Sequence, residues 1–182
     1  MKKLAHVSLL LSLLAAAGCG GPANPAQPPA APASSAAVAQ FMLAKDPGEG
    51  LGVVDAKLAG PAAKVVVEGR IANVVRGFAV LTLMDKALPY CGETNPEDHC
   101  KTPWDYCCEQ AKTRTANSMV VELHGPDGKP LATPAIADLR LLDAIKATGT
   151  LRKDADGNFV LVATGLFRVQ RPELPNDLKW PQ

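Results

Sequence analysis

Five short segments that are typical of β-strands, the first and fourth with clear period-two alternation of apolar and polar side chains, constrain the fold of this chain most strongly. In the first of them, Val65, Val67 and Ile71 alternate with polar neighbours. Such alternation places successive side chains on opposite faces of a strand, and glycine-containing turns between the segments are typical of hairpins. The predicted strands span 64–71, 78–84, 117–123, 145–151 and 158–166.

The order of these elements predicts a small barrel. Residues 134–142 are predicted to form a short helix, so the chain consists of three strands, a helix and two further strands. This is the order of the OB-fold, a five-stranded Greek-key barrel, and residues 64–168 resemble that fold. The expected fold class is therefore mainly β. Short strands with such turns also occur in β-sandwiches, which are the alternative.

Shorter segments flank the predicted barrel. Residues 40–63 are expected to form a short helical lead-in, in which a helix at 53–58 is bracketed by Gly52 and Gly60. Residues 169–182 are expected to be a C-terminal tail.

A long insert, residues 86–116, separates the second and third predicted strands. It exceeds the ~12–15 residues beyond which a loop in a compact domain is usually functional or disordered. Its richness in cysteine and aromatic residues argues against mere disorder. The residues concerned are Cys91, Cys100, Cys107, Cys108, Tyr90, Trp104, Tyr106 and His99.

Within the insert, Thr102 and Pro103 predict the start of a helix. A hydroxyl residue at the N-cap, a proline at the first helical position and an acid at the third form a helix-start signal. The predicted helix spans 103–112 and would set Cys107 and Cys108 about 100° apart on its surface. The two thiols would then face different partners.

The four insert cysteines predict two disulfide bonds. An even number of thiols in an exported chain favours disulfides. Adjacent cysteines rarely pair with each other, because the Cα atoms of a disulfide lie roughly 4.4–6.8 Å apart. We therefore expect Cys91 and Cys100 each to pair with one of Cys107 and Cys108, in an order that the sequence leaves open.

A metal site is the alternative for the same residues. Four thiolates, or three together with His99, are suitable ligands for zinc or a cuprous ion. However, the cysteine spacing lacks the C-x2-C pair that is typical of zinc sites and of redox-active dithiols. We therefore expect no cofactor. The alternatives are zinc or copper bound by the insert, and thiol redox chemistry of its cysteines.

The aromatic residues of the insert are candidates for a contact patch. Rigid aromatic side chains often anchor interfaces, so Tyr90, Trp104 and Tyr106 are the residues that a protein or small-ligand partner would contact. The competing interpretation is that Trp104 packs the insert onto the barrel. The sequence does not identify the partner.

The N-terminus resembles a bacterial lipoprotein signal. Two lysines precede an apolar stretch from Leu4 to Ala17, and small residues lead into Cys19. The ~14 apolar residues are fewer than the roughly 20 needed to cross a bilayer. The resemblance implies that residues 1–18 are a signal peptide and that Cys19 becomes the lipidated first residue of the mature chain.

Residues 19–39 are expected to comprise the lipidated cysteine and a tether. They are rich in proline and alanine and carry no charge, so they bury little apolar surface. Two or more acyl chains on one residue hold a protein on a membrane without a spanning helix. Among lipoproteins with this type of signal, the absence of an aspartate after the lipidated cysteine fits the outer rather than the inner membrane. No aspartate follows Cys19, so the resemblance implies the periplasmic side of the outer membrane.

Charge balance and motifs argue against two classes of function. Loss of residues 1–18 removes two lysines and leaves 17 basic against 18 acidic residues, a formal charge of −1. This balance disfavours nucleic-acid binding, because nonspecific affinity for nucleic acid comes mainly from Lys and Arg side chains that neutralise phosphates. Recognition of nucleic acid or oligosaccharide by the binding face of the OB-fold is a minor alternative. The sequence contains no G-x-S-x-G and no other catalytic constellation, so we expect no enzymatic activity.

Four stretches carry a resemblance to a wider family. They are VVEGRI at 66–71, LTLMD at 81–85, the insert cysteines with TPWDYCCE at 102–109, and GKPL at 128–131. Over roughly residues 44–168 the chain resembles uncharacterised bacterial lipoproteins with an OB-fold-like domain that carries a TPWDYCC cysteine insert. The resemblance implies fold and location and supplies no catalytic residues. We therefore expect a membrane-anchored extracytoplasmic lipoprotein whose OB-like domain is a non-enzymatic binding or scaffold module.

Overall fold

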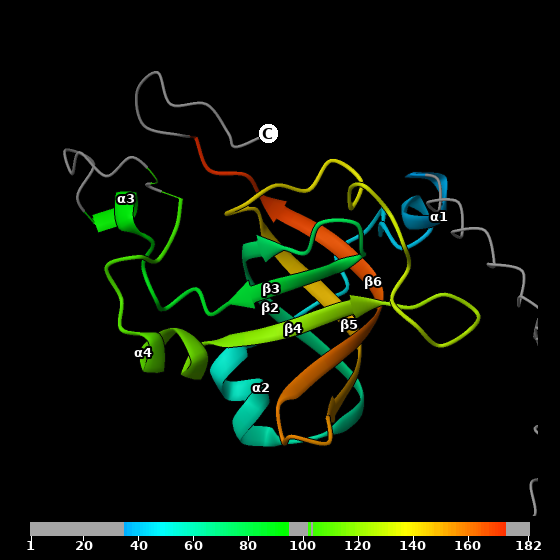
Figure 1. Ribbon diagram of the computed structural model, residues 1–182, viewed down its shortest axis with the longest axis horizontal. Helices are drawn as coiled ribbons and strands as arrows, with labels where there is room; N and C mark the ends of the chain where they lie inside the picture. Colours follow the sequence, from blue (N-terminus) through cyan, green and yellow to red (C-terminus); the bar gives the residue numbers. More distant parts are fainter. Residues whose placement is uncertain (1–34, 95–101, 103, 174–182) are drawn as a thin grey trace, which may run out of the picture. The chain divides into compact units, whose positions relative to one another are not determined.

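The computed structural model describes residues 35–94, 102 and 104–173, and a closed barrel of five strands forms its centre (Figure 1). The strands are β2 (Ala62–Val74), β3 (Val80–Met84), β4 (Ser118–Leu123), β5 (Ala144–Lys153) and β6 (Phe159–Gln170). Their order is β2-β3-β4-β6-β5, and pairing of β2 with β5 closes the barrel. The predicted mainly β fold with an OB-like barrel is confirmed.

The pairing pattern is that of a Greek key. β4 and β6 run parallel, whereas the other four pairings within the barrel are antiparallel. A short additional strand, β1 (Leu51–Gly52), pairs in parallel with β2. It lies in the segment predicted to be a helical lead-in, and two residues are too few for a period-two pattern to reveal a strand.

Irregularities in the strand register allow the strands to curve enough to close. The register shifts between Ile71 and Asn73 in β2, and between Thr148 and Gly149 in β5. At Gly149 a Cβ atom would lie 2.1 Å from the carbonyl oxygen of Val162, so the neighbouring backbone leaves no room for a side chain. Bulges and close-approach glycines of this kind bend strands at barrel corners.

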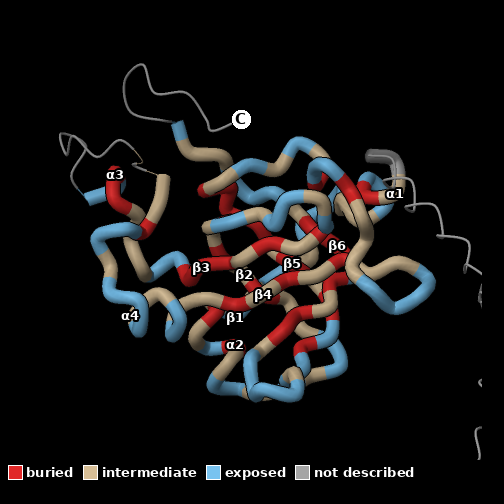
Figure 2. Tube along the Cα trace, viewed as in Figure 1, coloured by how far each residue is buried: buried red, intermediate tan, exposed pale blue. Residues whose placement is uncertain are grey.

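The inward positions of the barrel strands form one hydrophobic core, drawn red in Figure 2. Each of the five strands contributes large side chains that are fully buried, as the period-two pattern predicts. They are Val67, Ile71, Leu81, Leu83, Leu123, Ile145, Leu151, Leu161 and Leu166. Closure of the sheet into a barrel buries these apolar side chains and also removes the exposed edges of the sheet.

Helix α2 (Val53–Ala59) confirms the helix predicted at 53–58. Its N-cap, Gly52, provides no capping side chain, and Asp85 takes over this role from a distant part of the chain. Asp85 Oδ2 accepts a hydrogen bond from the Val54 N–H at 2.9 Å, and Oδ1 accepts one from the Ala87 N–H at 2.9 Å. Since Asp85 directly follows β3, it ties the lead-in to the point where the insert begins.

The helix predicted over 134–142 is wrong, because these residues form turns and bends. Asp143 Oδ2 accepts a hydrogen bond from the Arg140 N–H at 3.0 Å, and the Thr133 hydroxyl donates to the Ala135 carbonyl at 2.7 Å. Such side-chain bonds satisfy backbone groups that a helix would otherwise use. Leu142 then adopts the left-handed conformation, with φ 65°, before the chain enters β5.

The folded unit extends beyond the predicted barrel at both ends. Val38 of helix α1 (Ser35–Ala39) has none of its surface exposed, so the fold begins inside the predicted tether. At the other end β6 continues to Gln170, inside the predicted tail. Arg171 then makes two hydrogen bonds of 2.7 Å with the fully buried carboxylate of Asp143, which fastens the chain after its last strand.

Several predicted segments lie outside the described residues. These are the signal peptide at 1–18, Cys19, the tether as far as residue 34 and the tail from residue 174. In the part of the chain that the structure describes, no helix combines the length and apolarity needed to span a bilayer.

Candidate functional site

One arginine of the barrel holds the first part of the insert. Arg70 in β2 donates through Nη1 to the Lys86 carbonyl at 3.1 Å and pairs through Nη2 with the carboxylate of Glu93. Its guanidinium carbon lies 5.4 Å from the centre of the Tyr90 ring. Because the Arg70 side chain is only 15% exposed, these charge-assisted contacts are partly shielded from water and hold helix α3 (Cys91–Thr94) against β2.

A second hydrophobic cluster fastens the insert to the barrel. Its buried members are Met84 at the end of β3, Leu142 before β5, and Tyr106 in the insert. Tyr90 and Trp104 are half-buried and pack against it. Helix α3, which follows Tyr90 in the chain, lies on the side of the barrel opposite α1 (Figure 1). Only Tyr90 and Trp104 of the three predicted contact residues keep an accessible surface, since Tyr106 is 4% exposed.

The environment of Tyr106 makes it a packing residue. Burial raises the pKa of its hydroxyl to about 12, although the nearby cation of Arg70 acts in the opposite direction. A phenol with such a pKa stays neutral across the physiological range. Tyr106 therefore adds apolar contact area beneath the insert rather than a charge.

The helix predicted over 103–112 is wrong. Residues 104–110 form turns and bends, and helix α4 (Ala111–Ala116) begins only after them. Asp105 provides the reason, because its Oδ1 accepts a hydrogen bond from the Cys107 N–H at 2.9 Å. This side-chain bond to the backbone two residues on closes a turn that competes with a helix.

Asp105 also binds the other side of the insert. Its main-chain oxygen accepts a hydrogen bond from the Cys91 N–H at 2.9 Å, and its Oδ1 lies 3.3 Å from the Cys91 sulfur. Burial tends to raise the pKa of Asp105, but hydrogen bonds from the Thr102 side chain and Cys107 outweigh it and hold that pKa below its usual value. Thr102 thus serves the Asp105 carboxylate instead of capping the predicted helix.

Three thiols converge next to Asp105, one from α3 and two from the turn. The Cys91 sulfur lies 3.5 Å from that of Cys107 and 3.7 Å from that of Cys108, and the latter two are 4.0 Å apart. These distances exceed the ~2.05 Å of a disulfide bond, so no disulfide joins the three described cysteines of the insert. The predicted divergence of Cys107 and Cys108 is wrong, because the turn directs both sulfurs toward Cys91.

The thiols differ in their exposure to solvent. Cys91 is 8% exposed, whereas Cys107 and Cys108 are exposed. Burial raises the pKa of the Cys91 thiol, although hydrogen bonds from the Cys108 N–H and the Cys107 side chain act in the opposite direction by favouring the thiolate. The cluster therefore has one shielded sulfur and two that a reagent from solvent reaches.

The remaining two candidates of the insert, Cys100 and His99, lie outside the described residues. The predicted disulfide of Cys100 and the ligand role of His99 therefore stay predictions. The described part of the insert nevertheless brings three potential metal ligands together, with all ligand atoms of Cys91, Cys107 and Cys108 within 4.8 Å of one another.

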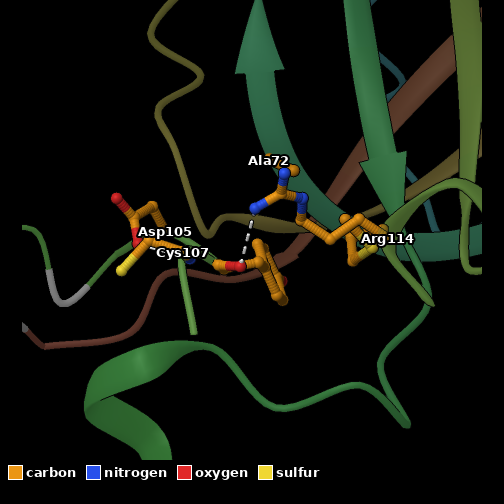
Figure 3. Close-up of a pocket in the computed structure, with 6 residues that line it drawn as sticks. Ala72, Asp105, Cys107 and Arg114 are labelled. Carbon is orange, nitrogen blue, oxygen red and sulfur yellow. Dashed lines mark hydrogen bonds between the residues drawn. The ribbon is translucent and has the colours of Figure 1, made fainter. Parts of the chain in front are cut away.

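A small cavity of about 240 Å³ opens beside the cluster. Figure 3 shows Asp105 and Cys107 on one side of it and Arg114 on the other, with Arg114 donating to the Tyr106 carbonyl oxygen at 3.3 Å. Since pockets for drug-sized ligands measure about 300–1,000 Å³, the cavity is too small for a large organic ligand. Its lining residues are Ala72, Met84, Asp105, Tyr106, Cys107 and Arg114.

A second cavity, of about 400 Å³, lies between α2 and the first residues of β4 and β6. Lys57, the basic residue among those that line it, donates to the carbonyl oxygens of Thr115, Ala116 and Ser118 at 2.8–3.1 Å. Lys57 thereby satisfies carbonyls at the C-terminal end of α4. Burial lowers its pKa, and its charge is used within the fold rather than offered to an anionic ligand.

Sequence reasoning missed the two residues that organise the site. In the sequence Arg70 is only one of the polar residues of the first strand, and its partners Lys86 and Glu93 lie 16 and 23 residues away, so no local signal marks it. Asp105 was interpreted as part of a helix start. Its position two residues before Cys107 is also the spacing of an Asx turn, which would have revealed it.

Comparison with protein families and with curated proteins identifies no relative from which the function of this chain could be inferred. No protein family matches the chain, and no curated protein is significantly similar to it. The fold defines the domain as an OB-like barrel with a cysteine-containing insert. Because a fold of this kind hosts many functions, the function has to be argued from the site.

Proposed function

We propose that the protein is a lipid-anchored extracytoplasmic lipoprotein whose barrel is a non-enzymatic binding module, with the insert as its binding end. The observation that carries this proposal is the way the insert is fixed. Arg70, Asp105 and the cluster around Tyr106 hold the exposed thiols and the half-buried aromatic rings of the insert in fixed positions. A surface fixed in advance loses little conformational entropy when it binds.

The proposed location rests on the N-terminal sequence. Cys19 would carry the lipid, and the proline- and alanine-rich residues that follow would act as a spacer up to the buried Val38. A chain of about 20 residues in a partly polyproline-like state reaches several tens of ångströms. The barrel would then stand clear of the lipid headgroups, on the periplasmic side of the outer membrane.

The anchor is tested by replacing the proposed lipid-carrying residue. The wild-type chain is expected in the membrane fraction, with mass spectrometry showing a diacylated or triacylated N-terminal peptide that begins at Cys19. The variant Cys19→Ala should lack this modification and remain as an uncleaved precursor. An unmodified Cys19 peptide in the wild-type chain would refute the anchor.

The binding role of the insert is tested by photo-crosslinking in intact cells. A photoreactive amino acid is placed at Trp104 or, as the control, at Phe78, which is 48% exposed in the turn between β2 and β3. A discrete adduct, identified by mass spectrometry, is expected from position 104 alone. Equal labelling from both positions would show that the insert is not a preferred contact surface.

Disulfide stabilisation of the insert is the second candidate role for the thiols. The Cys91 sulfur already lies within 3.7 Å of both Cys107 and Cys108, so a movement of about 1.5 Å would bring it to bonding distance. Exchange with an external disulfide, which takes up the two thiol hydrogens as it is reduced to two thiols, would then form the bond. Closing a loop of roughly 15 residues contributes about 3 kcal/mol in the chain-entropy model. The denatured, unreduced mass distinguishes this state, because each disulfide lowers it by two hydrogens.

A further inference from the structure

The three sulfurs of the insert form a nearly equilateral triangle, with sides of 3.5, 3.7 and 4.0 Å. A point equidistant from the three sulfurs lies about 2.2 Å from each of them, in their plane, which is close to the ~2.3 Å zinc–thiolate bond. At that bond length, two sulfurs of a tetrahedral site are ~3.8 Å apart. A metal ion therefore fits slightly above the plane of the triangle without displacing its ligands.

We propose that Cys91, Cys107 and Cys108 bind one thiophilic metal cation, Zn²⁺ or Cu⁺, as thiolates. This inference deepens the proposed function and rests on it, because it names the ligand that the insert binds. Thiolates are the ligands that select these two ions among the biological metals. The three sulfurs supply one face of the coordination polyhedron.

Packing alone does not account for the arrangement. Cysteines that act as small hydrophobic residues are among the most buried residue types, yet Cys107 and Cys108 are both exposed. Neighbouring side chains along a chain usually diverge, whereas these two sulfurs both point toward Cys91. Three mutually adjacent thiols also form at most one disulfide among themselves, whereas one metal ion binds all three.

The surroundings favour a cation at the centre of the triangle. Three thiolates within 4.0 Å of one another repel, so the deprotonated cluster needs a positive charge. The carboxylate of Asp105, 3.3 Å from the Cys91 sulfur, adds to the negative potential.

Asp105 and Arg70 preorganise this site. Asp105 binds the backbone of Cys91 through its main-chain oxygen and that of Cys107 through its carboxylate, so one residue sets the separation of the two halves. Arg70 fixes α3, which carries Cys91, to the barrel. Because two of the ligands face solvent, the ion is exchangeable with an external carrier.

The test uses the purified full chain in detergent, kept reduced and anaerobic, with one equivalent of Zn²⁺ or Cu⁺ as the probe. Native mass spectrometry is expected to show one ion per chain that is lost on denaturation. Substitution with Co²⁺ should produce the thiolate charge-transfer absorption of a sulfur-coordinated metal. This spectrum is recorded on the wild-type protein, so it does not depend on whether any variant folds.

Variants identify the ligands. Each of Cys91→Ser, Cys107→Ser and Cys108→Ser should weaken binding at least ~100-fold, since even residues that merely support a ligand typically contribute 10–100-fold. The exposed neighbour Gln110→Ser is the control and should bind as the wild type does. Circular dichroism confirms that the barrel of each variant is folded before its affinity is compared.

The outcomes separate this inference from the proposed function. If the reduced wild-type chain retains no more of either ion than the triple serine variant, or Co²⁺ gives no thiolate band, the metal site is refuted while the anchor and crosslinking results stand. Zinc retention and copper retention both support the site and identify the ion. Failure of Cys19 lipidation would instead overturn the proposed location and leave the metal result intact.

Discussion

The barrel and the insert of this protein are stabilised in different ways. The barrel buries large aliphatic side chains from five strands in one hydrophobic core. The insert has only a small cluster around Tyr106 and depends on individual polar contacts from Arg70 and Asp105. Hydrophobic burial is non-directional, whereas a hydrogen bond specifies a geometry. The barrel therefore provides stability, whereas the insert provides a defined arrangement of reactive groups.

The largest effect is expected from a cavity in the barrel. Leu161 of β6 has none of its surface exposed, and Leu161→Ala should lower the free energy of unfolding by about 3 kcal/mol through lost burial and an unfilled cavity. Denaturant unfolding measures this value. The control is Leu58→Ala on α2, where the side chain is 80% exposed and the change should be near zero. Equal losses in the two variants would contradict the assignment of the core.

A smaller and local effect is expected from the arginine that joins the two regions. Arg70→Ala removes the hydrogen bonds to the Lys86 carbonyl and to Glu93, so we expect a loss of about 2 kcal/mol. Hydrogen exchange should increase around α3, while the strands stay protected.

The matched control for Arg70 is Arg152→Ala on β5. Arg152 is 46% exposed and its ion pair with Glu122 is 3.5 Å long, so its removal should cost less than about 0.5 kcal/mol. If hydrogen exchange rises uniformly over the whole domain in Arg70→Ala, the insert and the barrel form a single cooperative unit and are not stabilised separately.

The third effect is confined to the turn that carries the thiols. Asp105→Ala removes the acceptor of the Cys107 N–H and should reduce stability by about 1 kcal/mol. Because the turn then loses its fixed geometry, alkylation of Cys91 should accelerate. Asp127→Ala is the control, since Asp127 makes the same kind of bond, to the Lys129 N–H at 3.2 Å, in a turn far from the cysteines. Unchanged alkylation of Cys91 would show that Asp105 does not position it.

The same contrast explains how far the sequence predicted the structure. The barrel strands and α2 follow from local periodicity, and residues such as Val67 and Ile71 are buried as their alternation requires. The two helices predicted over 103–112 and 134–142 fail because Asp105 and Asp143 bond to nearby backbone N–H groups and stabilise turns. Propensity and start signals do not register such competition.

The candidate site was predicted only in its residue types. Cysteine enrichment identified the insert, but the convergence of Cys107 and Cys108 on Cys91 depends on Asp105 and on the distant Arg70. The burial of Tyr106 likewise depends on Met84 and Leu142, which the fold brings to it from other elements. Contacts between residues far apart in sequence have no local pattern, so the geometry of the site became visible only in the structure.

The smallest effect is expected from an exposed ion pair on the barrel. The hydrogen bond from Arg168 lowers the pKa of Asp138, whose side chain is 63% exposed. A carboxyl whose folded-state pKa lies below its unfolded value of about 3.9 contributes stability above that pH and loses it as the pH falls through the folded-state pKa. Solvent screening limits this contribution to about 0.5 kcal/mol.

Asp138→Asn should therefore reduce stability slightly at neutral pH and low salt. The difference from the wild type should vanish as the pH falls through the folded-state pKa of Asp138, because the wild-type side chain then becomes uncharged as well. Urea unfolding at a series of pH values measures this, with Asp156→Asn in the exposed turn before β6 as the control. High salt should also remove the difference, because exposed charges are screened. A difference that persists at low pH would mean that Asp138 acts through its shape and hydrogen bonds and not through its charge. In that case the barrel, like the insert, would depend on a directional polar contact at its surface.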